Sequence, residues 1–214
     1  RAWPFEQARN LLARLLKSRL TDDAERHLAS TLIHAGKTDE ARKRFESVYN
    51  TDKNTLRLID AYGRFLSAHG DRDGAIKVYR AFDQIVPRHP VVTAALDDLN
   101  AGRTLQPFVR TAKQGAAELL YGLGAVGGRQ GDELAAMIYL RLALYLEPEN
   151  GLALVTLADV YERLKQNEQA IDAYDSVPEN SPLRVNADIQ IGLLLETMGK
   201  KDEATKLLSD RVKE

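Results

Sequence analysis

Apolar residues along most of this chain are spaced as they are on one face of an α-helix. In five places an alanine is followed four positions later by a large apolar residue. In four of these places another apolar residue comes three positions after that. Such spacings put side chains on one helix face. The alanines are Ala41, Ala75, Ala136, Ala170 and Ala204, and the large residues are Phe45, Tyr79, Leu140, Tyr174 and Leu208. The exception is Arg211, which breaks the third column.

The pattern recurs at a fixed interval. Ala41 and Ala75 are 34 residues apart, and the same distance separates Ala136, Ala170 and Ala204 in turn. The interval from Ala75 to Ala136 is 61 residues, which is one period and a further 27. A constant period of this length indicates a stacked array of helix pairs. A small residue lies twelve positions before each alanine: Ala29, Gly63, Gly124, Ala158 and Gly192.

Each column has a physical reason. The small residue and the alanine are expected where the two helices of a pair cross closely, because a larger side chain would push them apart. The large apolar residue is expected to fill the space between one pair and the next. Glycine is expected to end the first helix, because it takes the left-handed conformation without steric cost. Lys165 replaces that glycine in one repeat, where we expect Asn167 to serve instead. The glycines are Gly36, Gly70, Gly131 and Gly199.

These columns resemble the tetratricopeptide repeat, whose period is 34 residues. Residues 151–184 match strongly apart from Lys165, and 22–55, 56–89, 117–150 and 185–214 follow the same register. The stretches 115–123 and 139–146 look like long bacterial multi-repeat proteins of this family. The resemblance implies an all-α fold, a right-handed superhelix (α-solenoid) of about five helix-turn-helix repeats with an insert. It also implies a binding role without a single defined activity.

The register divides the chain into four parts. Residues 1–21 form an amphipathic pattern, which we interpret as the second helix of a truncated repeat, and 22–89 hold two repeats. Residues 90–116 are the excess, a degenerate half-repeat or connector with a helix over 91–99 and a turn at 104–107. Residues 117–214 hold three repeats. Because the chain begins at Arg1 without Met, we interpret it as a segment of a longer protein.

Composition narrows the class of protein. The 214 residues include 30 basic and 31 acidic side chains and no cysteine. The absence of cysteine excludes a disulfide framework and thiolate chemistry, and the balanced charge argues against a nucleic-acid binder. No apolar run approaches the roughly 18 residues of a membrane span. The compartment stays open between the cytoplasm and the periplasm or envelope of a bacterium, with any targeting signal outside this segment.

Candidate chemistry is sparse, and we predict no enzyme activity, cofactor or metal. Residues 122–127 spell G-x-G-x-x-G, but a dinucleotide site needs a strand before this motif and a helix after it. Here the motif falls inside a repeat, where packing explains Gly124. The four histidines lack zinc-ligand spacing. Ser30 and His34 are four residues apart, yet no orienting acid or oxyanion pocket accompanies them.

The resemblance implies that the first helix of each pair lines a concave face suited to a peptide or a partner helix. That face is expected to be basic toward the N-terminus and apolar-acidic toward the C-terminus. The alternative is that its apolar members pack against neighbouring helices. Family members that bind the C-terminal carboxylate of chaperones do so with a set of lysine, asparagine and arginine side chains on the inner helices. The corresponding positions of this chain carry other residue types, which disfavours chaperone-tail binding. The predicted partner-binding residues are Arg26, Arg57, Arg64, Tyr121, Leu152, Val155, Asp159, Glu162, Ile189 and Leu193.

Three functions follow, in order of preference. The first is a non-catalytic scaffold that binds a protein or peptide of unknown identity on the concave face. The second is a self-associating assembly module, with a possible homodimer formed through exposed ends of the solenoid. The third, least favoured, is a nucleotide-binding protein that uses Gly122 to Gly127.

Overall fold

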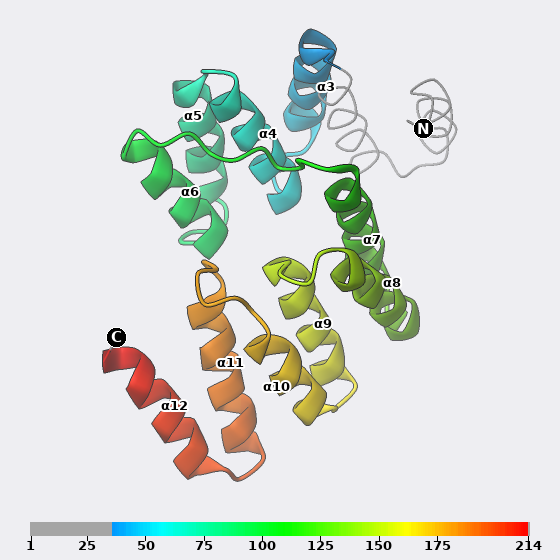
Figure 1. Ribbon diagram of the computed structural model, residues 1–214, viewed down its shortest axis with the longest axis vertical. Helices are drawn as coiled ribbons and strands as arrows, with labels where there is room; N and C mark the ends of the chain where they lie inside the picture. Colours follow the sequence, from blue (N-terminus) through cyan, green and yellow to red (C-terminus); the bar gives the residue numbers. More distant parts are fainter. Residues whose placement is uncertain (1–35, 214) are drawn as a thin grey trace. The chain divides into compact units, whose positions relative to one another are not determined.

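The computed structural model describes residues 36–213, and all regular secondary structure in that range is helical (Figure 1). The chain divides into two compact units, 1–110 and 111–214. The all-α fold of helix pairs is thereby confirmed for the described residues. The predicted helix within 1–21, the Ser30–His34 pair and Arg26 lie outside them.

The first unit contains α3 (Thr38–Thr51), α4 (Leu56–Ala68), α5 (Arg72–Asp83) and α6 (Pro90–Asn100). The predicted alanine, large-residue and apolar columns supply much of its core, including Phe45, Tyr79 and Phe82. After α6 the chain leaves helical geometry over 101–111. Leu105, from this stretch, also belongs to the core cluster.

The second unit contains six helices in consecutive pairs. They are α7 (Ala112–Arg129) with α8 (Glu133–Leu146), α9 (Gly151–Arg163) with α10 (Asn167–Asp175), and α11 (Arg184–Thr197) with α12 (Lys201–Lys213). The helix α7 begins at Ala112, within the stretch expected to be connector. Thr111 explains this early start, because its hydroxyl accepts a hydrogen bond from the Gln114 N–H and caps the helix.

Four residues share this N-cap role, with a side-chain oxygen accepting from the N–H three positions later. They are Asp71, Thr111, Asp132 and Asn150. Asp71 and Asp132 begin the second helices of their pairs, directly after a glycine in the left-handed conformation. In these two pairs, the glycine that ends the first helix and the aspartate that caps the second together determine the turn between them. None of the helices in 36–213 is both long and apolar enough to cross a membrane.

The small column faces the large column of its own pair. A Cβ atom built on Gly63 would overlap the ring of Tyr79, and one on Gly124 would lie 2.7 Å from Leu140 Cγ. The close crossing predicted at these glycines is therefore present. The large residue also contacts the next pair, as expected for Phe45 on α3. Its ring centre lies 5.6 Å from that of Tyr62 and 5.2 Å from that of Phe65, both on α4.

Arg211, which interrupts the apolar column, has a specific partner. Its Nε lies 2.7 Å from Asp188 Oδ2, and its Nη2 lies 2.8 Å from Glu179 Oε2. Asp188 also receives Arg184, whose Nη2 lies 2.6 Å from Oδ1. Arg184 Nη1 donates to the backbone carbonyl of Val177 at 2.8 Å. The last pair is thus held by a charged network where the other pairs use an apolar contact.

The helix-ending glycines have the predicted left-handed backbone, with φ of 82° at Gly70 and 81° at Gly131. In the repeat that lacks this glycine, Lys165 itself takes φ 59°. The expectation that Asn167 would serve instead is wrong, since Asn167 is the first residue of α10. The crossing of the two helices fixes the backbone of the turn between them. The residue at this position must therefore adopt the left-handed conformation whatever its side chain.

Replacing Lys165 with glycine is therefore expected to raise the free energy of unfolding by about 0.5–1 kcal/mol, because the left-handed strain of a non-glycine residue is removed. Urea denaturation of the whole chain measures this difference. Lys165→Ala is the matched control, since it removes the same side chain but keeps the strain. Equal stability of the glycine and alanine variants would contradict backbone strain at this position.

Candidate functional site

Ile189 and Leu193 of the predicted inner face are exposed on α11, and Val185, which was not among the predicted residues, extends their row. Val185, Ile189 and Leu193 are 64%, 44% and 52% exposed, and their spacing of four residues places them in one row along the helix. Large apolar side chains in a continuous exposed row are unusual on a soluble domain and mark interaction surfaces. The alternative that Ile189 and Leu193 are covered by neighbouring helices of this unit does not hold.

The corresponding row on α9 is part apolar and part acidic. Leu152 and Val155 are half-buried, and Asp159 and Glu162 follow on the same helix face. The Tyr174 hydroxyl, on α10, lies 2.8 Å from Asp159 Oδ1 and 2.7 Å from Glu162 Oε1. One phenol proton therefore serves two carboxylates, which holds both acids at one end of the row.

Burial affects the ionisation of this cluster. Partial removal of its carboxyl from water raises the pKa of Asp159; the hydrogen bond from Tyr174 opposes this and the negative charge of Glu162 reinforces it. Burial also raises the pKa of Tyr174 far above its usual value, as do the hydrogen bonds to Glu162 and Asp159. The phenol consequently stays protonated at neutral pH and keeps donating. The cluster therefore places two carboxyl groups, held by one phenol, at the end of the α9 row.

Equivalent positions of successive repeats place these two rows in register. Val155 and Ile189 are one 34-residue period apart, and so are Asp159 and Leu193. Equivalent positions of stacked repeats lie on the same side of the array. We call the residues of this surface the α9–α11 face. They are Leu152, Val155, Asp159, Glu162, Val185, Ile189 and Leu193.

The predicted residues of the first unit are in contact with the chain itself. Arg64 Nε lies 2.7 Å from Asp60 Oδ1, and Arg57 Nη1 lies 3.5 Å from Asp60 Oδ2. Arg64 Nη1 also donates to the Gln106 carbonyl at 3.1 Å. The Arg57 guanidinium lies 4.2 Å from the centre of the Phe108 ring. Arg57 and Arg64, the basic members of the predicted face that the structure describes, are thus partly covered by residues that follow α6.

Tyr121 differs from the expectation of an accessible inner-face residue, because it is buried on α7. Its neighbour on the same helix face, Glu118, is buried as well and lies 3.4 Å from the Asn150 side-chain amide. Because Asn150 is the N-cap residue of α9, this contact shows that this part of α7 packs within the unit rather than toward solvent.

The glycine run lies well inside α7, where it serves packing. A Cβ on Gly127 would contact the backbone of Ala136 at 3.4 Å, as Gly124 contacts Leu140. A phosphate-binding glycine motif requires a helix N-terminus, and this run has none. Among the described residues no group of three histidine or acidic side chains could hold a metal ion.

A second exposed apolar row lies on α8 and was not predicted from the sequence. Its members follow helical spacing on the side away from Ala136 and Leu140. The sequence could have predicted this row. Residues 133–146 are apolar around most of the helix, whereas a helix that buries one face needs apolar residues only on that face. The exposed residues are Leu134, Ile138, Leu142 and Tyr145.

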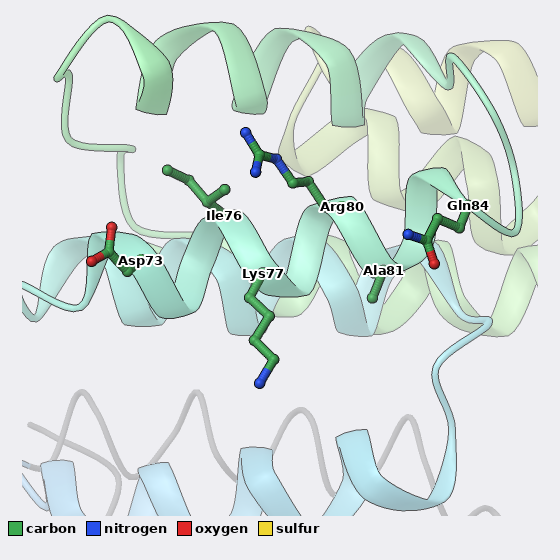
Figure 2. Close-up of a pocket in the computed structure, with 6 residues that line it drawn as sticks. All are labelled: Asp73, Ile76, Lys77, Arg80, Ala81 and Gln84. Atoms are coloured by element: carbon green, nitrogen blue, oxygen red, sulfur yellow. The ribbon is translucent and has the colours of Figure 1, made fainter.

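A shallow groove runs along α5 (Figure 2). Lys77 and Arg80 extend from the helix in different directions, and Asp73 and Gln84 lie at opposite ends of the row. The carboxylate is therefore not held beside either cation as an acid–base pair. The lining residues are Asp73, Ile76, Lys77, Arg80, Ala81 and Gln84.

Comparison with known proteins gives two family matches. Models of the tetratricopeptide repeat match residues 117–150 and 152–183. Similar solved structures include MamA, with 23% identity over 86% of this chain and 92% of that chain and a TM-score of 0.44. PilF of Pseudomonas aeruginosa shows 17% identity over 95% and 81%, with a TM-score of 0.39. YrrB shows 14% identity over 98% and 91%, with a TM-score of 0.41. Residues 117–183 of this chain therefore contain two tetratricopeptide repeats.

Proposed function

We propose that this chain is a non-catalytic interaction scaffold that binds a peptide or protein segment on the α9–α11 face. The observation that carries the proposal is the exposed row of Val185, Ile189 and Leu193. It follows directly after the matched repeat 152–183, and Ile189 and Leu193 lie one 34-residue period after Val155 and Asp159 of α9. Each of the three side chains is about half exposed, so a partner that covers it gains roughly 1 kcal/mol from burial.

The chemistry of the face specifies the partner. The row on α11 offers an apolar strip, and Asp159 and Glu162 offer two carboxylates near it. A partner segment with apolar residues at helical spacing and a lysine or arginine beside them would match both features. This corresponds to an amphipathic helix that lies in a groove, in which apolar anchors supply affinity and charges set the register.

The test is a selection of peptides from a random displayed library against the whole chain, followed by affinity measurement. We expect the selected peptides to combine apolar residues with lysine or arginine. Ile189→Glu/Leu193→Glu should weaken their binding at least tenfold, because two anchor sites become charged. Both side chains are exposed, so the helical circular dichroism should be unchanged.

The matched control is Ile138→Glu/Leu142→Glu, which places the same charges on the exposed row of α8. It should leave peptide affinity within about twofold, as expected of surface changes remote from the binding site. Equal weakening by both pairs of substitutions, or none by the first pair, would refute the α9–α11 face as the binding site.

A second candidate function is self-association, which the exposed row on α8 favours. If two copies pair through this row, the mass measured by light scattering should rise toward that of a dimer with concentration. Ile138→Glu/Leu142→Glu should then hold the chain at monomer mass, whereas Ile189→Glu/Leu193→Glu should not. A wild-type mass that stays monomeric at all concentrations would exclude this function for the chain.

A further inference from the structure

Residues 103–108 run along α4 without forming a helix, and their contacts are those of a bound peptide. The Leu105 N–H donates to Ser67 Oγ at 3.0 Å. The Gln106 carbonyl accepts from Arg64 Nη1 at 3.1 Å. Leu105 is only 4% exposed and belongs to the core of the unit. Backbone hydrogen bonds and a buried side-chain anchor are the means by which extended peptides are recognised.

The aromatic residue of this segment provides a second anchor. Phe108 packs partly buried against the core, with the Arg57 guanidinium 4.2 Å from its ring centre. A cation over an aromatic face contributes about 0.5–2 kcal/mol. Pro107 lies between the two anchors and restricts the backbone to extended geometry. The segment thus presents leucine, proline and phenylalanine in a nearly preformed shape.

The positions that this segment covers are equivalent to those of the α9–α11 face. Ala75 and Ala170 occupy the same column, 95 residues apart. The same interval relates Arg57 to Leu152 and Arg64 to Asp159, and it likewise relates Ser67 to Glu162. The residues that contact the 103–108 segment therefore occupy the columns that α9 leaves open. One repeat presents its inner face, and the other has its inner face filled by the chain itself.

We propose that the inner face of α4 is a second peptide-binding surface, and that residues 103–108 are its resident ligand. The surface accepts an extended segment with leucine and phenylalanine three positions apart and proline before the phenylalanine. A partner segment of this chemistry binds there by displacing residues 103–108. The proposal concerns a surface separate from the α9–α11 face and does not depend on it.

The chain just before the 103–108 segment is fixed by a hydrogen bond, whereas the segment itself buries few side chains. Arg72 Nε donates to the Leu99 carbonyl at 2.6 Å, which fixes the end of α6. Of the six residues in the segment, only Leu105 is buried; Phe108 is half-buried and the rest are exposed. Displacement therefore exposes two side chains, while the helices keep their own contacts. A tethered ligand competes at an effective concentration in the millimolar range, so a free peptide binds weakly until the tethered one is impaired.

The experiment uses a fluorescent peptide with the sequence of residues 102–110, GRTLQPFVR. Its binding to the full chain is followed by anisotropy. The chain with Leu105→Ser/Phe108→Ala should bind it on the order of tenfold more tightly than the wild type, because a larger fraction has the surface open. A peptide with alanine at both anchors should not bind either chain.

Further variants test whether the peptide occupies the inner face of α4. Adding Ser67→Ala to the Leu105→Ser/Phe108→Ala chain should weaken the peptide again, since it removes the acceptor of the Leu105 N–H. Ile189→Glu/Leu193→Glu should have no effect on it, which distinguishes failure here from failure of the proposed function. If the double variant loses helical circular dichroism, Phe108→Ala alone replaces it, because that ring is only half-buried. Equal peptide affinity for wild type and impaired chain, or equal binding of the alanine peptide, would overturn the proposal.

Discussion

Replacing Asp188 with alanine is expected to lower the free energy of unfolding by about 3–5 kcal/mol, because the change removes the buried carboxylate that pairs with both Arg184 and Arg211. Asp188 is 1% exposed. Its two oxygens lie 2.6 Å from Arg184 Nη2 and 2.7 Å from Arg211 Nε. Arg184 is itself buried, so water cannot replace the lost charge partner. Urea denaturation at neutral pH measures the change.

Asp175→Ala is the matched control for this prediction. Its carboxylate also pairs with Arg184, at 3.2 Å, but it is largely exposed. Exposed ion pairs contribute about 0–1 kcal/mol, so this variant should lose no more than that. A loss of the same size at Asp175 and Asp188 would show that burial is not what gives the Asp188 pair its importance.

The second large effect is expected at Asp60, where alanine should cost about 3 kcal/mol of unfolding free energy. Asp60 is buried in α4 and accepts from the Tyr79 hydroxyl at 2.8 Å and from Arg64 Nε at 2.7 Å. Removing the carboxylate leaves the buried phenol with the more distant Asp60 backbone carbonyl, at 3.3 Å, and deprives the partly buried guanidinium of its charge partner. Since the guanidinium also holds the Gln106 carbonyl, the 103–108 segment should become less protected from hydrogen exchange.

Tyr79→Phe separates the two contributions at this site. It removes only the phenol hydroxyl and leaves Asp60 paired with Arg64, so it should cost about 0.5–1.5 kcal/mol, the net value of one hydrogen bond. It should also leave the exchange of residues 103–108 unchanged. If Tyr79→Phe cost as much as Asp60→Ala, the arginine contacts would be irrelevant to stability.

The sequence was informative wherever one local rule decides the structure. The alanine column and the large residues other than the half-buried Leu208 lie in the core, and the glycines at 70 and 131 have the predicted left-handed backbone. Lys165 shows the limit of such rules, because residue preference suggested a substitute at Asn167 while the geometry of the turn required position 165. Position within the repeat overrode side-chain type.

The candidate site was less predictable, because it depends on contacts between distant residues. The covering of Arg57 and Arg64 by residues 106–108 joins positions more than forty residues apart, and no periodicity encodes it. The role of Arg211 depends likewise on Asp188, in another helix. The register left open whether Ile189 and Leu193 are exposed or covered, and both are exposed, whereas Tyr121, expected on the accessible face, is buried on α7.

The arginine pair at the end of the second unit has a consequence for how the repeats unfold. In an array of repeats, stability is the sum of each repeat's own stability and the coupling to its neighbours. Arg184 joins α11 to the chain that follows α10, through the Asp175 and Val177 carbonyls. Arg211 then joins α12 to the same cluster through Asp188 and Glu179. The coupling between α10, α11 and α12 therefore depends on ion pairs and hydrogen bonds of these two arginines. We expect α11, α12 and the connection that follows α10 to unfold together. We also expect α12 to fray less than a terminal helix without such contacts.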